Sequence, residues 1–543
     1  MNNRVRQQFP ALQQRINGQP LCYLDSAATA QKPMSVITAV QQFYRRENAN
    51  VHRAGYQLAA IATDKFESAR AQVAAFFGMA ANELVWTKGC TESINLVAHS
   101  WALGHICAHD RMLVSGLEHH ANLVPWQQVC KATGAHLDII PVQDSGELDL
   151  NAYQELLQHK PKLVAISHVS NALGTVNPLH TMISQAKAVG AIVLVDGAQA
   201  AAHLAIDVPA LGADFYVFSG HKMYGPTGIG GLLAKPCMLE QFEPWQTGGE
   251  MVETVSYQEA TWAPLPYRLE AGTPNIAGAI GLAKATEFMT QLSSDWRQQE
   301  SDLLAYLRFK LSQLPYIQLI GNAAQQVAVQ SFVSVTMHAQ DVAQYLDQSG
   351  VAVRVGKHCA HPLLDALGVD ATLRASLACY STEQDVDQLI AALEFAHTAE
   401  ALPNTIEQHW NEKSALWALG EAKGWQHTLK LLIELGRALP PELQANKEQQ
   451  YWINGCESST WLMLELDDQH HKLCCKVESE ANVIRGVLHV LALHFNTLNS
   501  KQQASFDGAQ WLTNIGIVGQ LSTTRNQGMR AVMQQLHAAV GAV

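Results

Sequence analysis

Positive charge is scarce in this sequence, which has 36 Lys and Arg residues against 48 Asp and Glu residues and a formal net charge of −12. This balance argues against direct binding to nucleic acid, whose phosphates attract basic surfaces. Long hydrophobic runs are also absent, and the first ten residues lack the apolar stretch of a secretory signal. We therefore expect a cytoplasmic protein with no membrane partner.

Metal-binding patterns are nearly absent as well. Only His358-Cys359-Ala360-His361 resembles a ligand cluster, and it has no second ligand pair at zinc spacing, so we expect no metal site. Ten cysteines in a chain with no secretory signal indicate free thiols in a reducing compartment, not a disulfide framework. The chain has no internal repeat and no low-complexity tract, and its 543 residues suffice for several domains.

Between residues 80 and 235, short apolar runs alternate with helical patterns, which is typical of βαβ units and a mostly parallel sheet. The runs predict buried strands at residues 84–86, 112–114, 163–166, 192–195 and 215–218. In such α/β folds ligands bind beyond the carboxyl ends of the strands. The polar residues directly after these runs are therefore candidates for a site.

The later parts of the chain predict further domains. Residues from about 266 to 397, together with the N-terminal segment, are expected to form a smaller α+β domain beside a large domain at about 20–265, completing a unit over 1–397. We expect a linker over residues 398–412, which include Pro403. The remaining residues, 413–543, are numerous enough to fold alone, and two helical patterns there flank a predicted hairpin over 461–477.

Three residues after predicted strands carry the groups that pyridoxal phosphate requires of an enzyme. Lys222, in Ser219-Gly220-His221-Lys222, offers an amine for the cofactor's aldehyde. Asp196 offers a carboxylate that holds the pyridine nitrogen protonated, and Gln199 is placed to bind the ring hydroxyl. A lone Asp after a strand is usually a turn or a helix cap, and a lone Lys is usually solvated, but the combination favours a cofactor site.

A phosphate site is predicted nearby. Gly89-Cys90-Thr91 lies between a strand and a helix, where backbone N–H groups and the positive end of the helix attract an anion. Ser219 and His221 would complete this cradle. The glycine run at 228–231 does not open a helix after a strand, so we interpret it as flexible backbone beside Lys222 and not as a dinucleotide site.

Two cysteines suggest a donor and an acceptor of sulfur. Cys359 is surrounded by groups that favour its thiolate: Arg354, Lys357, His358 and His361. The alternative, an inert buried thiol, is disfavoured by this flanking charge. Cys456 lies on a separate segment after Gly455, whose backbone freedom would let a loop swing. One polypeptide with these groups is suited to extract sulfur and to relay it.

Residues 1 to about 397 resemble a group II (SufS/CsdA-like) cysteine desulfurase, of the class V, fold-type I group of pyridoxal-phosphate enzymes. The motifs that carry the resemblance are Tyr23-Leu24-Asp25-Ser26-Ala27-Ala28, Asn50-Val51-His52-Arg53, Glu92-Ser93-Ile94-Asn95-Leu96-Val97-Ala98, Glu118-His119-His120-Ala121-Asn122, Asp196-Gly197-Ala198-Gln199, Ser219-Gly220-His221-Lys222, Glu270-Ala271-Gly272-Thr273-Pro274-Asn275 and His358-Cys359-Ala360. The implied fold is a mostly parallel central sheet with a smaller α+β domain.

The resemblance implies L-cysteine as substrate, L-alanine as product and a persulfide on Cys359. It also implies that His119 stacks on the cofactor and assists proton transfer, and that Asn171 lies beside the ring and the substrate. Arg374, with Arg354, would take the substrate carboxylate. Thr273 would reach the phosphate of a neighbouring subunit, which predicts a homodimer. Cys90 departs from the family's usual Thr, whereas Thr91 keeps the other phosphate contact.

Residues from about 405 to 543 resemble the SufE/CsdE family of sulfur acceptors, a separate α+β domain. The matching motifs are Ile453-Asn454-Gly455-Cys456-Glu457-Ser458 with Trp461-Leu462, Val483-Ile484-Arg485-Gly486, and Leu521-Ser522-Thr523-Thr524-Arg525-Asn526-Gln527-Gly528. The resemblance implies that Cys456 accepts the persulfide, whereas Cys474 and Cys475 lie on a predicted strand and are expected to pack.

Several alternatives stay open on the sequence alone. The same active site would support a selenocysteine lyase, and the C-terminal domain is alternatively a docking or regulatory module that carries no sulfur. Substitution of Cys456 separates the module from the acceptor. The final recipient of sulfur is also open, between an iron–sulfur scaffold, a tRNA-modifying enzyme and a cofactor pathway.

Overall fold

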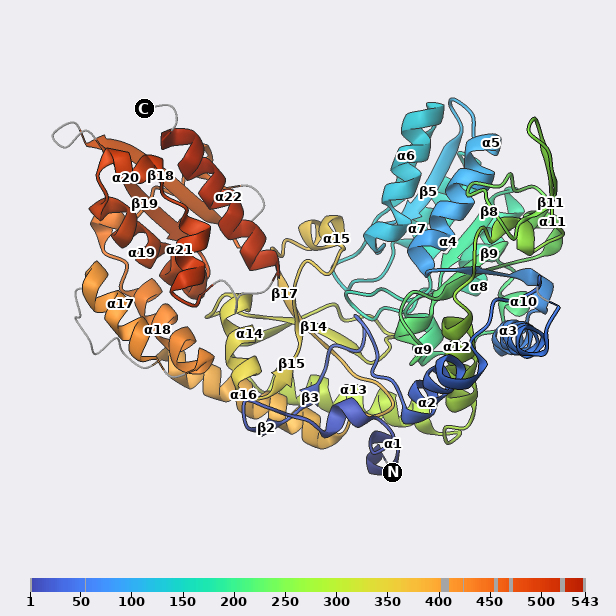
Figure 1. Cartoon of the computed structure of the whole chain (residues 1–543), viewed down its shortest axis with the longest axis horizontal. Coiled ribbons are helices and arrows are strands. Elements are labelled where there is room, and N and C mark those ends of the chain that lie inside the picture. The colour runs from blue at the N-terminus through green and yellow to red at the C-terminus, as the bar shows by residue number, and fades with distance from the viewer. Residues whose placement is uncertain are drawn as a thin grey trace. The chain divides into compact units, whose positions relative to one another are not determined.

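The computed structural model describes residues 2–53, 55–401, 410–422, 424–453, 458–467, 472–517 and 523–540. The chain forms two compact units (Figure 1). The first comprises residues 1–333 and 349–390, and the second comprises residues 334–348 and 391–543. Cys456 lies outside the described residues.

A seven-stranded sheet forms the centre of the first unit. Its strands, in spatial order, are β4 (Leu84–Thr87), β10 (Gly230–Ala234), β9 (Phe215–Ser219), β8 (Ile192–Asp196), β7 (Leu163–Ser167), β5 (Arg111–Ser115) and β6 (His136–Ile140). All neighbours are parallel except β10, which runs antiparallel to both β4 and β9. The carboxyl ends of β4, β5, β7, β8 and β9 therefore meet at one edge.

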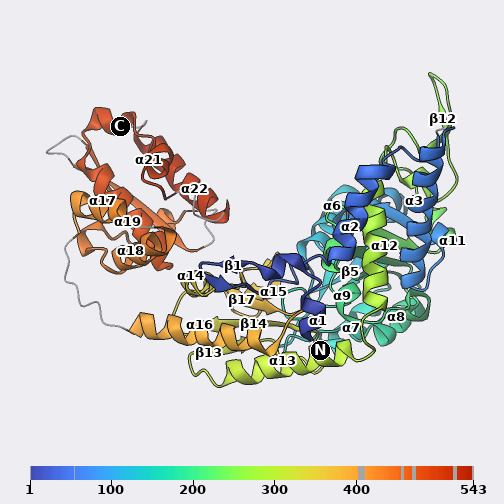
Figure 2. The same ribbon diagram turned by 60° about the horizontal axis from the view of Figure 1, so that its bottom comes forward.

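Hydrophobic cores cover both faces of this sheet, because successive strand residues point to opposite sides. Val164 and Ile166 of β7 enter one core, whereas Leu163 and Ala165 enter the other. The first core includes α3 (Gln57–Phe76), α7 (Leu150–Leu157), α8 (Leu179–Ala188) and α12 (Ile276–Thr290), and the second includes α4 (Cys90–Val97) and α6 (Val124–Thr133). Figure 2 shows α12 lying beside α2 (Met34–Gln42) and α3, with which it packs. This layering confirms the α/β fold and all five predicted strands.

The interpretation of residues 228–231 as a flexible loop was wrong. Gly230 and Gly231 begin β10 and are buried. A Cβ atom on Gly230 would lie 2.4 Å from the Phe218 carbonyl oxygen and 2.6 Å from Gly89 Cα. Glycine is therefore required because the backbones of β10, β9 and the loop after β4 approach closely.

The rest of the first unit surrounds a smaller sheet of β13 (Ile317–Ile320), β14 (Val329–Ser334), β17 (Thr372–Ser376) and β16 (Arg354–Gly356). The N-terminal strand β3 (Cys22–Tyr23) pairs in parallel with β15 (Val351–Ala352), and Asp25 forms a bridge to Ser376. These pairings bring the N-terminal segment to the strands that carry Arg354 and Arg374. The other elements of this unit are α1 (Asn2–Arg6), β1 (Arg15–Ile16), β2 (Gln19–Pro20), α5 (Leu103–His105), α9 (Ala200–His203), α10 (Val208–Leu211), α11 (Pro236–Leu239), β11 (Val252–Val255), β12 (Ala260–Trp262), α13 (Trp296–Ser312) and α15 (His361–Ala366).

The second unit contains an antiparallel hairpin of β18 (Thr460–Asp467) and β19 (Lys472–Ser479), as the sequence predicts. Its helices are α14 (Ala339–Gln348), the last part of α16 (Glu383–Ala401), α17 (Glu412–Glu421), α18 (Trp425–Arg437), α19 (Asn482–Thr497), α20 (Ser500–Ala504), α21 (Gly508–Asn514) and α22 (Thr523–Val540). The Asp341 carboxylate of α14 accepts hydrogen bonds from the N–H groups of Asn482 (2.8 Å) and Val483 (3.2 Å) at the start of α19. Most of the predicted linker falls on residues 402–409, outside the described part of the chain.

Helices α18 and α19 approach so closely that only glycine fits at two positions. A Cβ atom on Gly436 would lie 2.1 Å from the Asn482 carbonyl oxygen, and one on Gly486 would lie 1.8 Å from that of Leu432. The two helices therefore pack backbone against backbone around the core of this unit.

No helix among the described residues has the length and apolar character that crossing a membrane requires. No group of three or more His, Cys, Asp or Glu side chains among them is arranged to hold a metal ion.

Candidate active site

One cavity of the first unit lies at the carboxyl ends of strands β4, β5, β7, β8 and β9. It is lined by Ala27, Ala28, Cys90, Thr91, His119, Ala121, Ser167, Val169, Asn171, Asp196, Ala198, Gln199, Ser219, His221, Lys222, Arg354, His358, Cys359 and Arg374. The structure thus brings together eleven predicted site residues: Thr91, His119, Asn171, Asp196, Gln199, Ser219, His221, Lys222, Arg354, Cys359 and Arg374. They come from segments far apart in the sequence, as expected for the edge of an α/β sheet.

Lys222 and Asp196 form the charged centre of this cavity. Burial lowers the pKa of Lys222, although the Asp196 carboxylate opposes this shift. Burial also raises the pKa of Asp196, against the influence of the Ala198 N–H group and the Lys222 ammonium. A lysine with a lowered pKa is a better nucleophile toward an aldehyde, and a buried carboxylate is stabilised by a protonated ring nitrogen.

The loop after β4 is shaped for an anion. Gly89 has a φ angle of +148°, and a Cβ atom there would lie 3.0 Å from Ser219 Oγ. The Cys90 N–H group donates to Ser219 Oγ at 2.9 Å, and Thr91 lines the cavity in the first turn of α4. Burial raises the pKa of the Cys90 thiol and the nearby Asp196 carboxylate adds to this shift, so this departure from the family's usual Thr places a neutral thiol beside the charged centre.

Asn171 and Gln199 both line the cavity. The Gln199 side-chain amide donates to the Ala27 carbonyl oxygen at 2.8 Å, and that of Asn171 donates to the His358 carbonyl oxygen at 2.7 Å. The Asn171 Oδ1 atom is buried and accepts no hydrogen bond in the structure. A buried polar atom without a partner indicates that a ligand completes the site.

The ring of His119 is held as a neutral imidazole. Its Nδ1 atom accepts a hydrogen bond from the Ala121 N–H group at 3.0 Å, so the neutral ring carries its proton on Nε2. Burial, together with the Lys222 ammonium, lowers the pKa of His119 to about 3. The residue before it, Glu118, is buried and accepts from the Ser167 N–H group (2.6 Å) and from the Asn122 amide (2.7 Å). Burial raises the pKa of Glu118 to about 8.

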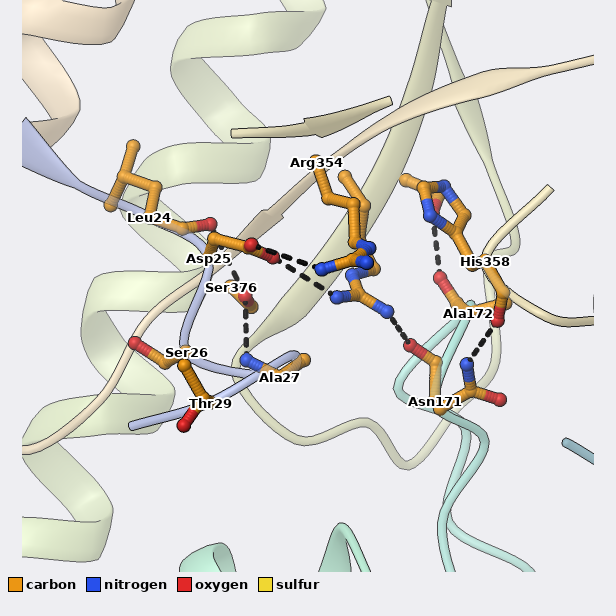
Figure 3. Close-up of polar contacts among 12 residues, drawn as sticks. Leu24, Asp25, Ser26, Ala27, Thr29, Asn171, Ala172, Arg354, His358 and Ser376 are labelled. Carbon is orange, nitrogen blue, oxygen red and sulfur yellow. Dashed lines mark hydrogen bonds and ion pairs between the residues drawn. The ribbon is translucent and has the colours of Figure 1, made fainter. Parts of the chain in front are cut away.

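Two arginines share one aspartate on the side of the smaller sheet (Figure 3). Asp25 accepts from Arg374 at 3.2 Å and from Arg354 at 3.3 Å, and Arg374 also donates to the Asn171 carbonyl oxygen at 2.8 Å. Arg374 is only 2% exposed, and burial lowers its pKa to about 10. Its buried Nε atom has no hydrogen-bond partner in the structure.

Cys359 is exposed at the mouth of the cavity, on a loop with an unusual backbone. His358 and Cys359 have φ angles of +52° and +53°. Residues with side chains rarely adopt this left-handed conformation, so surrounding contacts must hold it. The His358 ring is buried and shares a hydrogen bond of 2.7 Å with Thr372 Oγ1.

One predicted site residue lies outside this cavity, and two residues near the cavity were not predicted. Thr273 does not line this cavity but lies in a second one with Trp86, Lys88, Glu92 and Trp245. Sequence reasoning missed Asp25 and Glu118 as site residues. Asp25 belongs to the motif at residues 23–28, yet its role depends on Arg354 and Arg374, which only the fold brings to it.

The residues present fit pyridoxal phosphate. The cavity has an amine, a buried carboxylate near it, backbone N–H groups at the start of α4, and unpartnered polar atoms on Asn171 and Arg374. Lys222 would hold the aldehyde carbon, Asp196 the ring nitrogen, and the Gly89–Thr91 segment with Ser219 the phosphate.

Comparisons with known proteins agree with this geometry. Residues 22–389 match the family described as aminotransferase class-V, and residues 414–540 match the SufE family, described as an Fe-S metabolism associated domain. A cysteine desulfurase of Salmonella agona is 50% identical over 397 residues, covering 73% of this chain and 98% of the relative. A probable cysteine desulfurase of Vibrio cholerae is 48% identical over 391 residues, covering 72% and 96%.

Solved structures give the same result. The cysteine desulfurase CsdA of Escherichia coli, in its S-sulfonic acid form, superimposes with a TM-score of 0.68 at 41% identity and covers 73% of this chain and 98% of that one. The apo cysteine desulfurase of Thermococcus onnurineus gives the same TM-score, 0.68, at 37% identity, covering 72% and 98%. A structure at 22% identity (TM-score 0.61) that carries glycine covalently linked to pyridoxal phosphate shares the fold. The chain therefore belongs to the pyridoxal-phosphate-dependent cysteine desulfurases of the class-V aminotransferase family, with a SufE-family domain as its C-terminal part.

Proposed function

We propose that this protein converts L-cysteine to L-alanine, holds the released sulfur as a persulfide on Cys359, and passes it to Cys456 of its own SufE-family domain. The observation that supports the first step most directly is the position of Cys359, which lines the same cavity as Lys222 and Arg374. A nucleophilic thiol, an amine for the cofactor and a cation for the substrate thus share one site.

Bound pyridoxal phosphate supplies an electron sink that stabilises negative charge at the substrate α-carbon and so weakens its bond between the β-carbon and sulfur. Lys222 holds the cofactor until substrate arrives, and Asp196 keeps a positive charge on the ring nitrogen. Arg374 binds the substrate carboxylate, while Asp25 accepts a hydrogen bond from its Nη2 atom and so orients the guanidinium. Arg354 and Asn171 complete the substrate's surroundings.

Proton transfer is assigned to His119. Its Nδ1 atom is occupied by the Ala121 N–H group, so the proton on Nε2 is the one that it exchanges with the reacting centre. Burial lowers the pKa of His119 to about 3, so the ring is neutral and adds no second cation beside Lys222.

Sulfur transfer occurs at Cys359. Its thiolate attacks the substrate sulfur, so a sulfur–sulfur bond forms while the bond from sulfur to the substrate β-carbon breaks. The electron pair of the broken bond stays with the substrate carbon, which takes up protons and leaves as alanine. The product on the protein is a persulfide, which Cys456 then accepts by attack on its outer sulfur.

The further features of the proposal rest on the domain content and on Thr273. The SufE-family match supports an acceptor role for the C-terminal part, with an iron–sulfur scaffold or another thiolation pathway as the eventual recipient. Thr273 lies away from the cavity of its own chain, which is in keeping with a homodimer in which it reaches the partner's phosphate. The nine described cysteines are free thiols, in keeping with a cytoplasmic location.

The test uses sulfur-labelled cysteine. Cys359→Ser is expected to bind the cofactor and cysteine but to carry no labelled sulfur. Its rate of alanine formation should fall by a factor of about a thousand or more. Cys107→Ser, which removes another exposed thiol, serves as the matched control and should behave as the parent. Parent-like alanine formation by Cys359→Ser would refute the role of this thiol. Turnover of selenocysteine by the same variant would separate a selenocysteine lyase from a desulfurase.

A further inference from the structure

The loop that carries Cys359 is fastened to the segment after β5 by one residue. The His120 N–H group donates to the Cys359 carbonyl oxygen at 2.8 Å, and the His120 Nε2 atom accepts from the His361 N–H group at 3.2 Å. The rings of His120 and His361 also touch edge to face, with centroids 4.6 Å apart and planes at 75°. One residue thus holds the backbone directly after the nucleophile at two points, the Cys359 carbonyl oxygen and the His361 N–H group.

This loop needs external support. Both His358 and Cys359 occupy the left-handed region at φ angles of +52° and +53°, which side chains disfavour. Within the loop, the Ala360 N–H group donates to the Lys357 carbonyl oxygen at 2.9 Å, and outside it the Asn171 amide fixes the His358 carbonyl oxygen at 2.7 Å. The residues after Cys359 depend on His120, because it alone provides the acceptor for the His361 N–H group among the described contacts.

His120 itself stands on a rigid base. It begins the short helix His120–Asn122, whose Asn122 amide donates to buried Glu118 at 2.7 Å. The Asn122 Oδ1 atom accepts in turn from the ring N–H group of Trp126, which is fully buried, at 2.9 Å. The position of the His120 ring is therefore fixed from the core of the central sheet outward.

We propose that His120 is a positioning residue that holds the Cys359 thiol in its strained attacking conformation through the acceptor Nε2 atom. The inference rests on the proposed function, in which Cys359 attacks the substrate sulfur. An accepting Nε2 atom requires a neutral ring with its proton on Nδ1. Protonation of His120 turns this acceptor into a donor and breaks the bond to the His361 N–H group.

The titratable groups beside His120 are His119 on its own segment and Cys359 and His361 on the loop. Burial, followed by the nearness of His361, lowers the pKa of His120, so the neutral form is favoured in the folded protein. The hydrogen bond from the His361 N–H group to His120 Nε2, here called the clip, requires a neutral His120 ring. Because the pKa of His120 is lowered in the folded protein, the clip is fully present above the ordinary histidine pKa of about 6.5 and is lost as pH falls through the lower folded value.

The experiment compares two substitutions. His120→Phe keeps an aromatic ring against His361 but has no acceptor, and His120→Gln places an amide oxygen near the position of Nε2. His136→Phe, at an exposed histidine that begins β6, is the control. Retained absorbance of the bound cofactor verifies that each variant folds.

Two measurements are made on the holoenzyme. Hydrogen exchange is expected to show the His361 amide opening about five- to tenfold faster in His120→Phe, in keeping with the loss of one hydrogen bond, and near the parent rate in His120→Gln. Single-turnover persulfide formation should slow by about the same factor in His120→Phe with an unchanged KM for cysteine, since Arg374 and Asn171 are untouched. Protection of the His361 amide, corrected for intrinsic exchange, should fall at low pH in the parent and not in His120→Gln.

The proposal is overturned if His120→Phe matches the parent in either measurement, or if His120→Gln is as impaired as His120→Phe. Amide exchange requires no turnover, so it tests the clip even if Cys359→Ser were to show that another thiol takes the sulfur. Failure of the clip and failure of the proposed function are thereby distinguishable.

Discussion

Lys222 and Asp196 are buried opposite charges that each shift the other's protonation. Burial disfavours both ions, and each partially restores the charge of the other. Such a pair is costly in an empty interior, and its cost falls when a ligand supplies further charge and hydrogen bonds.

Lys222→Ala is expected to abolish the long-wavelength absorbance of bound cofactor in the resting enzyme and to remove all alanine formation, because no other amine lines the cavity near Asp196 in the described structure. The measurement is an absorbance spectrum after addition of pyridoxal phosphate and desalting, with an alanine assay. Lys88→Ala, at a side chain that is 79% exposed, is the control and should retain both signals. Residual alanine formation by Lys222→Ala would assign the amine elsewhere.

Lys222, Asp196 and Gln199 could be predicted because each follows a strand whose apolar run is evident, and the carboxyl ends of parallel strands converge. Asp25 could not be predicted in this way. It precedes Arg374 by 349 positions, and its pairing depends on a parallel contact between β3 and β15 that no local pattern encodes. Long-range pairings of this kind are decided by tertiary packing.

At the scale of elements, strands buried on both faces were predicted well because they are short continuous apolar runs. Strand β10 was missed because its first residues are glycines, which have weak strand preference. Glycine is needed there because the backbones at Phe218 and Gly89 approach Gly230 closely. The hairpin of β18 and β19 was predicted from two apolar segments that flank a polar turn. The tight contact of α18 with α19 was not predicted, since glycine inside a helix signals nothing about its partner.

Gly486→Ala is expected to destabilise the second unit by about 1–3 kcal/mol or more, because the added methyl group would meet the Leu432 carbonyl oxygen at 1.8 Å. Calorimetry of the full chain should show the transition of this unit at lower temperature, with bound-cofactor absorbance of the first unit unchanged. Gly420→Ala, also in a helix but with nothing within 4 Å, is the control and should be neutral or stabilising by up to about 1 kcal/mol. Equal melting of both variants would contradict the close packing of α18 and α19.

At the scale of the whole molecule, the proposed function requires sulfur to pass between two thiols of one chain, Cys359 and Cys456. Covalent linkage replaces diffusional encounter with a local effective concentration, which is commonly millimolar for flexible connections. Sulfur transfer should therefore proceed at a rate that does not depend on protein concentration.

Cys456→Ser is expected to leave the first persulfide on Cys359 intact but to lower multiple turnover severalfold, because Cys359 is no longer unloaded efficiently. Label from sulfur-labelled cysteine, located by peptide mass spectrometry, should then be found on Cys359 alone, and Cys474→Ser is the control. A parent enzyme that never carries label on Cys456 would make the C-terminal domain a docking module.

Mixing Cys359→Ser subunits with Cys456→Ser subunits decides which subunit receives the sulfur. Label on Cys456 in the mixed dimer, at a rate independent of protein concentration, would show transfer between subunits of one dimer. Its absence, with transfer intact in the parent, would show transfer within a single subunit.

The pairing of Asp25 with Arg374 also has a consequence for synthesis. The chain elongates at about 5–20 residues per second, so Asp25 waits about 20–70 s after leaving the peptidyl-transfer centre for the arginine 349 positions later. Residues 22–25 likewise have no strand partners until 351–376 have been made. In the proposed function, the residues that bind the substrate carboxylate are therefore assembled late in synthesis, and a ribosome stalled before Arg374 carries a nascent chain in which this part of the site is incomplete.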